Sequence, residues 1–270
     1  MPTARTDDGV AIAYETRGDG PPDLLFLHGW AGSGAFFGEI LEHLDLSRLR
    51  VVTIDLRGHG DSDKPAEGYT LDGFAADALA VADAVGAERF VLLGYSMGAK
   101  FAQYVALRAP ERVSGLVLVA GCPVSEIPLP QEMLDDWYGR AGDAARLIEL
   151  ERGFATRPVA EHLFEQFGRE AAKVPRVALE GSLGACIATS FGDAIGAVRA
   201  PALVVGGIHD PIFTPGALRA SVVGPLARAR LALLDSNHEI PVEQPRELAG
   251  LVEAFLAGLG GKTARARGSS

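Results

Sequence analysis

A serine lies at the centre of the pentapeptide GYSMG, residues 94–98, which has the spacing G-x-S-x-G. This spacing is typical of a sharp turn between a strand and a helix, with the serine hydroxyl exposed for reaction. The flanking sequence fits that context, because an apolar run precedes Ser96 and a helical pattern from Met97 to Ala109 follows it. Glycines flank the serine because its backbone is strained and larger side chains would crowd the turn. We therefore predict that Ser96 is a nucleophile.

A serine hydroxyl is a poor nucleophile near neutral pH and needs a base and an orienting carboxylate. In this type of site the chain order is serine, then acid, then histidine. His238 is the only histidine beyond position 210, and it follows an expected strand that ends at Leu234. Asp210 follows the preceding expected strand in the same way, where loops at the carboxyl ends of parallel strands build active sites. Glu126 is the alternative acid, but it lies among prolines in a longer loop, so Asp210 is favoured.

The oxyanion of a tetrahedral intermediate needs two backbone N–H donors. Met97, the residue after the serine, supplies one of them at the start of its helix. The second is expected from the glycine-rich loop after the apolar run LLFLHG, where Trp30 is the candidate. We predict that the N–H groups of Met97 and Trp30 form the oxyanion hole, and that Trp30 also contacts the substrate.

No cofactor and no metal site are expected. The zinc-protease motif HExxH would need a second histidine four residues after His238, and the residue there is Val242. The glycine-rich turns do not form GxGxxG or GxxxxGK, so they offer no nucleotide-binding loop. The two cysteines, Cys122 and Cys186, are too few for a disulfide framework and are expected to be reduced.

Short runs of β-branched residues alternate with helical patterns over most of the chain, which indicates a mainly parallel sheet covered on both faces. The expected strands are 10–16, 24–27, 51–54, 90–93, 115–119, 202–205 and 230–234. Apolar residues repeat at three- and four-residue spacing over 71–85 and 248–259, which predicts two amphipathic helices. The predicted fold class is therefore α/β.

The alternation of strands and helices stops in the middle of the chain, where helical patterns continue without a convincing strand. This segment opens with several prolines, which interrupt regular structure, and returns to the sheet at Arg199. The expected division is a core of 1–122 and 199–260, a helical insertion of 123–198 and a flexible tail of 261–270. The insertion is rich in aromatic residues, and we expect Trp137 and Phe191 to line the substrate pocket.

Composition excludes several classes of function. With 270 residues, of which 48% are hydrophobic and 22% charged, the chain can bury the core of one domain, with or without an insertion. Lysine and arginine number 25 against 35 acidic residues, and the net charge of −10 argues against nucleic-acid or anionic-membrane partners. The N-terminus has no apolar signal segment, and no run approaches the ~18 apolar residues that span a bilayer. We expect a soluble, cytoplasmic protein.

Taken together, the motifs resemble the α/β-hydrolase fold, in particular its lid-bearing esterases and cofactor-free haloperoxidases. The matching positions are His28-Gly29-Trp30, the turn DLRGHGDS at 55–62, the elbow around Ser96, the loop ending at Asp210, and His238 followed by Glu243-Gln244-Pro245. The resemblance implies a mostly parallel eight-stranded sheet flanked by helices, with a helical lid inserted after the sixth strand. It also implies the roles given above for the serine, the aspartate, the histidine and the two oxyanion donors.

The resemblance further implies that Arg57, Asp61 and Ser62 are structural and hold a loop beside the elbow. One position departs from the family pattern, because Asn237 stands where a glycine usually precedes the histidine. Asparagine tolerates a left-handed backbone, so the pattern can still be satisfied. The serine at position 96 also separates this chain from relatives that use aspartate to displace halide or open epoxides.

The expected function is a serine hydrolase that cleaves an ester or lactone of a small to medium, largely apolar molecule through an acyl-enzyme. The same residues could serve a C–C bond hydrolase, a perhydrolase or an acyltransferase, and the fold does not choose among them. A ligand receptor with residual hydrolase activity is an alternative from another class. Rapid turnover of a generic p-nitrophenyl ester would favour an enzyme over a receptor.

Overall fold

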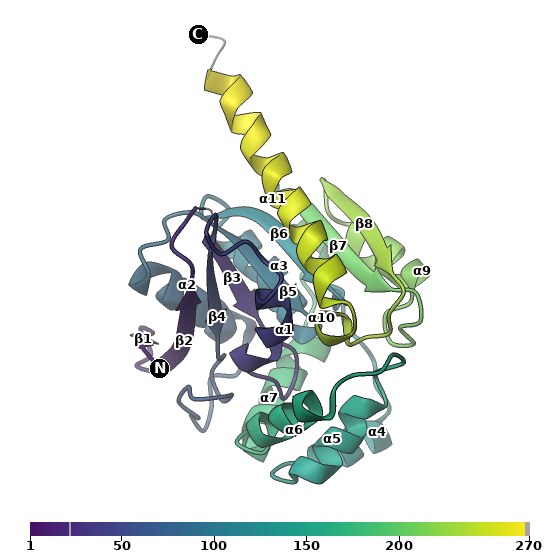
Figure 1. The fold of residues 1–270 in the computed structure, drawn as a ribbon. Coiled ribbons are helices and arrows are strands. Elements are labelled where there is room, and N and C mark those ends of the chain that lie inside the picture. The colour runs from purple at the N-terminus through teal and green to yellow at the C-terminus, as the bar shows by residue number, and fades with distance from the viewer. Residues whose placement is uncertain (22, 268–270) are drawn as a thin grey trace.

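The computed structural model describes residues 1–21 and 23–267, which contain an eight-stranded sheet (Figure 1). The strands are β1 (Thr3–Arg5), β2 (Ala11–Arg17), β3 (Asp23–Leu27), β4 (Arg50–Ile54), β5 (Phe90–Tyr95), β6 (Val113–Val119), β7 (Ala202–Gly207) and β8 (Ala229–Leu234). Their order is β1-β2-β4-β3-β5-β6-β7-β8. β2 runs antiparallel to both of its neighbours, β1 and β4, and all other pairs are parallel. The predicted α/β fold class, with a mostly parallel eight-stranded sheet, is confirmed.

The strands other than β1 coincide with the runs predicted from the sequence to within about two residues at each end. Those runs are detectable because most strands of the sheet are buried on both faces and therefore read as continuous apolar segments. β1 has only three residues, of which Ala4 alone is buried. A strand this short has no periodicity to find, and only the family resemblance implied an eighth strand.

The sheet separates two apolar clusters. Along β3, Leu25 and Leu27 belong to one cluster, whereas Leu24 and Phe26 belong to the other, because successive side chains of a strand point to opposite faces. Both clusters are closed by helices, so neither face of the central strands meets solvent. The active-site residues can therefore lie only at the ends of the strands.

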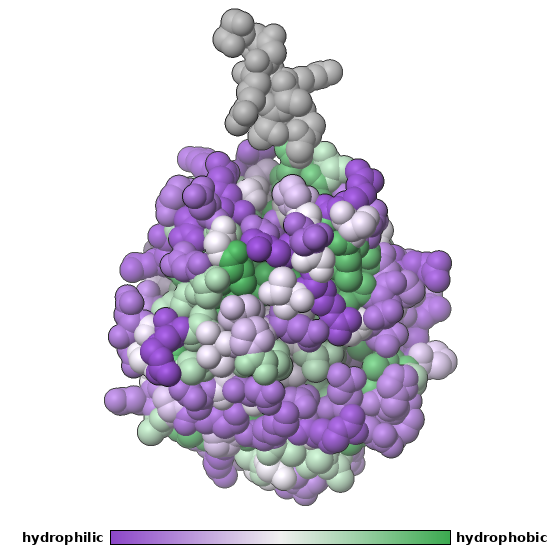
Figure 2. Space-filling view, turned by 60° about the vertical axis from the view of Figure 1, so that its left-hand side comes forward, coloured by the Kyte–Doolittle hydropathy of each residue, from purple (hydrophilic) through white to green (hydrophobic). Residues whose placement is uncertain are grey.

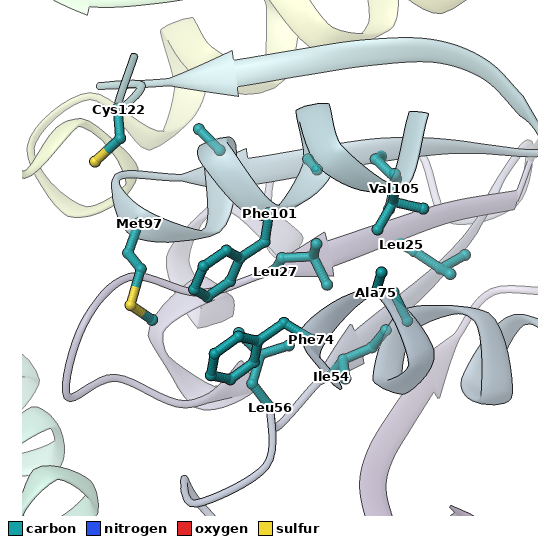
Figure 3. Close-up of a cluster of buried hydrophobic side chains, with 14 of the residues drawn as sticks. Leu25, Leu27, Ile54, Leu56, Phe74, Ala75, Met97, Phe101, Val105 and Cys122 are labelled. Atoms are coloured by element: carbon teal, nitrogen blue, oxygen red, sulfur yellow. The ribbon is translucent and has the colours of Figure 1, made fainter. Parts of the chain in front are cut away.

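The helices α2 (Leu71–Ala84) and α3 (Met97–Arg108) cover the first cluster. Their contact includes the stacked rings of Phe74 and Phe101, whose centroids lie 4.2 Å apart (Figure 3). The second cluster is covered mainly by α1 (Gly38–Leu41), α10 (Ile240–Glu243) and α11 (Pro245–Arg267). Short turns η1 (Gly34–Phe37), α9 (Pro215–Leu218) and η2 (Arg219–Val223) complete the core. The predicted helices over 71–85 and 248–259 lie in α2 and α11.

Between β6 and β7 the chain forms a group of helices that lies below the sheet in Figure 1. They are α4 (Gln131–Tyr138), α5 (Ala144–Arg152), α6 (Glu161–Ala171), α7 (Arg176–Ile187) and α8 (Gly192–Ile195). All of them fall within the predicted insertion, residues 123–198, and that interval contains no strand. We call this group the helical insertion; its division from the core as a separate domain stays a prediction.

The C-terminal helix runs further than the predicted core. The sequence places the start of a flexible tail at residue 261, whereas α11 continues to Arg267. The helix therefore crosses the predicted boundary, because alanine and lysine after the glycine pair permit helical continuation. The last three residues of the predicted tail, 268–270, lie outside the described residues.

The turn after β4 is held by buried polar groups, as the family resemblance implies for Arg57 and Ser62. Arg57 is fully buried; its Nη2 lies 2.8 Å from Asp77 Oδ1 and its Nη1 lies 2.8 Å from Asp8 Oδ2. Ser62 Oγ accepts a 2.7 Å hydrogen bond from the N–H of Ala13. These bonds fasten the turn to α2 and to β2.

Asp61 does not hold the turn with its side chain, contrary to the role implied by the resemblance. Its carboxylate is half exposed and lies 3.2 Å from Lys173 Nζ of the helical insertion. The carboxylate that closes the turn is Asp55, which accepts hydrogen bonds from the N–H groups of Gly34 and Asp61 at 2.7 and 2.8 Å. Asp55 ends the strand and is buried, whereas Asp61 stands at the outer tip of the turn.

Replacement of Arg57 by methionine is expected to lower the free energy of unfolding by about 3 to 5 kcal/mol, because it leaves a buried carboxylate without its partner. Burial already raises the pKa of Asp77 to about 6 despite the hydrogen bonds from Arg57. The double variant Arg57→Met/Asp77→Leu should recover much of the loss. Arg17→Met, which breaks an exposed pair with Glu15, should cost less than about 1 kcal/mol. Urea titration gives the free energy of unfolding of each of the three variants. Equal losses of stability in Arg57→Met and Arg17→Met would contradict a special role for the buried pair.

Polar side chains cover most of the face drawn in Figure 2, and hydrophobic ones form separate groups on it. Within the described residues, no helix combines the length and the apolar character needed to cross a membrane.

Candidate active site

Ser96 sits at the turn between β5 and α3, with φ 51° and ψ −116°. A positive φ is uncommon for a residue with a side chain and marks a strained turn. A Cβ atom at Gly94 would lie 2.4 Å from the carbonyl oxygen of Gly98, and one at Gly98 would lie 2.3 Å from that of Leu27. Glycine is thus required on both sides of the serine, as predicted, because the helix packs closely against its own strand and against β3.

The structure brings together the three side chains predicted to act with one another. Ser96 Oγ lies 3.0 Å from His238 Nε2, and His238 Nδ1 lies 2.9 Å from Asp210 Oδ2. Nδ1 donates to the carboxylate, so Nε2 carries the free lone pair and accepts the serine proton. This is the tautomer that a general base requires. All three residues follow carboxyl ends of parallel strands, namely β5, β7 and β8.

Asp210 is held rigidly by its own loop. Its Oδ1 accepts hydrogen bonds from the N–H groups of Ile212 and Phe213 at 2.8 and 2.9 Å. Burial raises the pKa of Asp210, but His238 and these N–H groups outweigh burial and bring it below the usual value. The carboxylate therefore stays ionised. Glu126, the alternative acid, is exposed and makes no contact with His238 in the described structure.

His238 is buried beside aromatic rings. Burial lowers the pKa of its imidazole, but the hydrogen bond and charge of Asp210, together with the charge of Glu239, raise it above 6.5 overall. The rings of Phe154 and Phe213 both lie 5.8 Å from the imidazole, centroid to centroid. The base is thus screened from bulk water on two sides.

The loop before His238 is held by hydrogen bonds of Asn237 and not by the left-handed backbone expected at that position. Asn237 is not among the residues with positive φ, so no left-handed backbone is needed there. Its Oδ1 instead accepts a 2.8 Å hydrogen bond from the N–H of His238, while its own N–H donates to Glu243 Oε2 at 2.7 Å. Glu243 Oε1 accepts from the N–H groups of Thr156 and Arg157 in the helical insertion. This carboxylate connects the histidine loop to the insertion, a role that the sequence did not reveal.

The predicted oxyanion donors lie close to the serine. Met97 is buried at the first turn of α3, and Trp30 follows Gly29, at which a Cβ atom would lie 3.4 Å from Ser96 Cβ. Within the described residues, neither the Met97 nor the Trp30 N–H group has a hydrogen-bond acceptor. Both are thus available to a ligand oxygen. The Trp30 indole N–H donates to the Leu179 carbonyl at 2.9 Å, which ties the loop to α7.

His28 supports this loop from beneath. Its Nε2 accepts a 3.1 Å hydrogen bond from the N–H of Leu56, and its Nδ1 donates to the carbonyl of Gly29 at 2.8 Å. Burial lowers the pKa of His28 to about 4. The imidazole is therefore neutral and acts as a spacer between the two loops rather than as a charge in the site.

A cavity of about 770 Å³ opens above Ser96 between the core and the helical insertion. The residues that line it are mostly apolar and include Trp30, Ser96, Met97, Trp137, Phe154 and His238. Phe191 does not line it, contrary to the prediction; its ring packs edge-on against Tyr104 of α3, 5.3 Å away. Phe191 precedes the short helix α8, which places it behind the cavity wall.

Two further features at the cavity were not predicted. Cys122 and Cys186, expected only as reduced buried fillers, are both free, line the cavity and approach each other. Lys100 of α3 is fully buried, and its Nζ donates to the carbonyls of Ser125, Cys186 and Thr189 at 2.8, 2.6 and 2.6 Å. A lysine in a helix gives no sequence signal for such a role. Here it fastens the insertion to the helix that follows the serine.

Comparison with known proteins supports one family. Residues 22–171 match the family model described as the alpha/beta hydrolase fold. The non-heme chloroperoxidase of Streptomyces lividans is 33% identical over 237 residues, which are 78% of this chain and 83% of that protein.

Two solved structures resemble nearly the whole chain. A putative aryl esterase from Burkholderia cenocepacia is 25% identical with a TM-score of 0.83, and the alignment covers 96% of this chain and 98% of that one.

The second structure is Est816, described as an N-acyl homoserine lactone degrading enzyme. It is 26% identical with a TM-score of 0.79, and the alignment covers 94% of this chain and all of the other, 100%. The family model covers more than half of the chain, and both structural matches cover more than nine-tenths of it. The chain therefore belongs to the α/β-hydrolase fold family.

Proposed function

We propose that this protein is a serine hydrolase that cleaves a carboxylic ester or lactone of a small to medium, largely apolar molecule. The observation that carries the proposal is the continuous hydrogen-bond chain from Ser96 through His238 to Asp210 at the floor of an apolar cavity. With His238 neutral and Asp210 ionised, the order of donors and acceptors in that chain is the one that acyl transfer requires. Relatives described as an aryl esterase and a lactone-degrading enzyme share the fold.

The proposed reaction has two halves. In the first, His238 Nε2 takes the proton of Ser96 Oγ as the oxygen attacks the acyl carbonyl, and the imidazolium then protonates the leaving alcohol. The Met97 and Trp30 N–H groups stabilise the oxyanion. In the second half, His238 removes a proton from water and the hydroxide attacks the acyl carbonyl. The imidazolium then returns the proton to Ser96 Oγ as the bond from the acyl group to the serine breaks and the acid leaves. Asp210 stabilises the imidazolium in both halves without accepting its proton.

The helical insertion is proposed to act as a lid that selects the substrate. It supplies Trp137, Phe154 and Phe167 to the cavity wall opposite the serine. The low polarity of this wall favours apolar acyl or alcohol groups, and such pockets discriminate by about 1 to 3 kcal/mol per methylene. A small-molecule ester is thus the proposed ligand.

The direct test is covalent labelling followed by a substrate screen. A fluorophosphonate should add once per chain, and peptide mass spectrometry should place the adduct on Ser96. Acyl esters of increasing chain length, aromatic esters and lactones should then be screened with the unmodified enzyme. An adduct on another residue, or the absence of turnover on every ester and lactone, would overturn the proposal.

The value of kcat/KM should rise with pH as His238 loses its proton, because only neutral imidazole accepts the serine proton. The pKa of His238 is raised above 6.5, so half-maximal activity should lie above that pH and the full rate on the alkaline side. Asp210 is already ionised there and does not limit the acid arm. A pH profile measured under single-turnover conditions checks this. A rate independent of pH across the neutral range would exclude a histidine base.

Trp137→Ala should change the ratio of kcat/KM values for long and short acyl esters by about tenfold, because the ring forms part of the cavity wall. Phe191→Ala is the matched control, since this aromatic residue lies in the same insertion but outside the cavity. It should leave the ratio unchanged. A similar change of ratio in both variants would contradict a selective role for Trp137.

A further inference from the structure

Two carboxyl groups meet at one wall of the cavity. Glu239, the residue after His238, is 1% exposed, and Glu151 of α5 lies beside it in the same wall. Tyr95 Oη donates a 2.8 Å hydrogen bond to Glu239 Oε1, whereas Glu239 Oε2 has no donor unless Glu151 carries a proton. The serine, histidine and aspartate do not need these groups. The two carboxyl groups therefore have no role in the proposed hydrolysis.

The pair lies at a boundary between two hollow regions. Glu151 and Glu239 line the 770 Å³ cavity above Ser96 and also a neighbouring cavity of about 480 Å³. Phe36 and Phe167 line both cavities as well. Both carboxyl groups thus border hollow space on two sides of the same wall. The pair is a polar strip in an otherwise apolar wall.

No lysine or arginine side chain compensates the pair. Within the described residues, neither carboxyl group forms an ion pair with lysine or arginine, and His238 supplies the positive charge that acts on Glu239. Burial raises the pKa of Glu151 to about 7, and burial together with the charge of Glu151 raises that of Glu239 well above its usual value. Adjacent carboxyl groups disfavour each other's ionisation, because like charges repel. Once Glu151 has lost its proton, the pair carries negative charge.

Aromatic rings surround the same space. Trp30 and Trp137 lie 5.5 Å apart between centroids, Trp137 and Phe154 lie 6.3 Å apart, and Phe36 stacks on Tyr95 at 4.8 Å. The faces of such rings attract organic cations, most strongly where water is excluded. A buried negative charge without a partner is costly, and a bound cation removes that cost. The buried negative charge and the aromatic rings therefore both favour an organic cation as the ligand.

We propose that the Glu151–Glu239 pair is a binding subsite for a primary ammonium group, so that the preferred substrates are esters or lactones that carry an amine. The ammonium would donate to Glu239 Oε2 and to Glu151 while the aromatic rings enclose its apolar stem. The substrate class rests on the proposed hydrolase function. The binding of a cation at this wall does not.

The test uses binding rather than turnover. The chain has two tryptophans, Trp30 and Trp137, and both line the cavity, so intrinsic fluorescence reports its occupancy. Benzylammonium and benzyl alcohol are titrated at about pH 8 into the Ser96→Ala protein; they have the same shape and differ in charge. Benzylammonium should bind roughly tenfold more tightly than the alcohol. Glu151→Gln and Glu239→Gln in that background should remove this preference and leave the alcohol's affinity unchanged.

Glu149→Gln, on the same helix but with a largely exposed carboxylate, is the matched control and should bind both probes normally. Equal affinity for the two probes in the Ser96→Ala protein with both glutamates intact would overturn the proposal. The proposal would also fail if Glu149→Gln weakened the binding of benzylammonium as much as Glu151→Gln and Glu239→Gln do, because the effect would then come from surface charge in general. Thermal unfolding confirms that each variant is folded, and Glu151→Gln, on the insertion, tests the proposal if Glu239→Gln does not fold. Cation binding without ester turnover would refute only the proposed hydrolase function.

Discussion

Ser96→Ala is expected to lower kcat for any ester substrate by roughly 10⁶, because loss of the nucleophile disables the histidine and the aspartate together. The Oγ atom that approaches His238 Nε2 at 3.0 Å is the only group that can form the acyl-enzyme in the proposed reaction. A small residual rate, roughly 10³ above the rate in water, should persist from the oxyanion donors and from binding. Steady-state rates with a p-nitrophenyl ester measure the loss, and KM should change little.

Ser182→Ala provides the matched control for this substitution. Ser182 is also fully buried, lies in α7 and does not line the cavity above Ser96. Its replacement should leave kcat within about twofold of the unmodified enzyme, because truncation of a serine away from the site removes no reacting group. Retention of wild-type turnover by a folded Ser96→Ala protein, with the fluorophosphonate still attached elsewhere, would assign the nucleophile to another residue.

The elements of the fold could be predicted because their signals are local. A parallel strand buried on both faces, such as β5, is a continuous apolar run, and α2 has an apolar stripe with helical spacing. The elbow adds a second local signal, since glycine at two fixed positions follows from the close packing of the helix on its strand. The exact ends of helices and strands depend on weaker sequence signals. α11 passes the predicted limit at residue 260 although glycines there signal a helix end, because such a signal weakens a helix without forbidding its continuation.

The reacting residues could be predicted for a different reason, namely that chain order and strand ends leave few candidates. His238 is unique beyond position 210, and Asp210 follows directly from a strand. The side chains of the insertion have no such constraint. Trp137 and Phe191 have the same aromatic character and both lie near helix ends, yet only Trp137 reaches the cavity. Their orientation depends on how the helices pack, which a single sequence does not encode in readable form.

Residues that join the core to the insertion were missed because each has an ordinary sequence neighbourhood. Glu151 and Glu239 are 88 positions apart and become a pair only in the folded chain. Lys100 and Glu243 likewise act on carbonyl and N–H groups of distant loops. A charged residue in an amphipathic helix is normally assigned to solvent. Only the buried environment distinguishes these residues from surface charges.

Asp210→Asn is expected to lower kcat by roughly 10³ to 10⁴ while the protein remains folded. Asp210 Oδ2 accepts the Nδ1 proton of His238 at 2.9 Å, and an amide that places its NH₂ group there would donate instead. The imidazole would then carry its proton on Nε2 and could not accept from Ser96. Oδ1 can keep its bonds to the N–H groups of Ile212 and Phe213, so the loop should be preserved.

Glu126→Gln is the informative comparison, because Glu126 is the other acid that chain order allows. Its side chain is exposed at the start of the insertion and does not contact His238, so kcat should stay within about twofold of the unmodified enzyme. The pH profile gives a second readout. Asp210 raises the pKa of His238, so Asp210→Asn should also move half-maximal residual activity to lower pH. A folded Asp210→Asn enzyme with normal kcat, beside an inactive Glu126→Gln enzyme, would transfer the orienting role to Glu126 and require the loop after β6 to move onto the histidine.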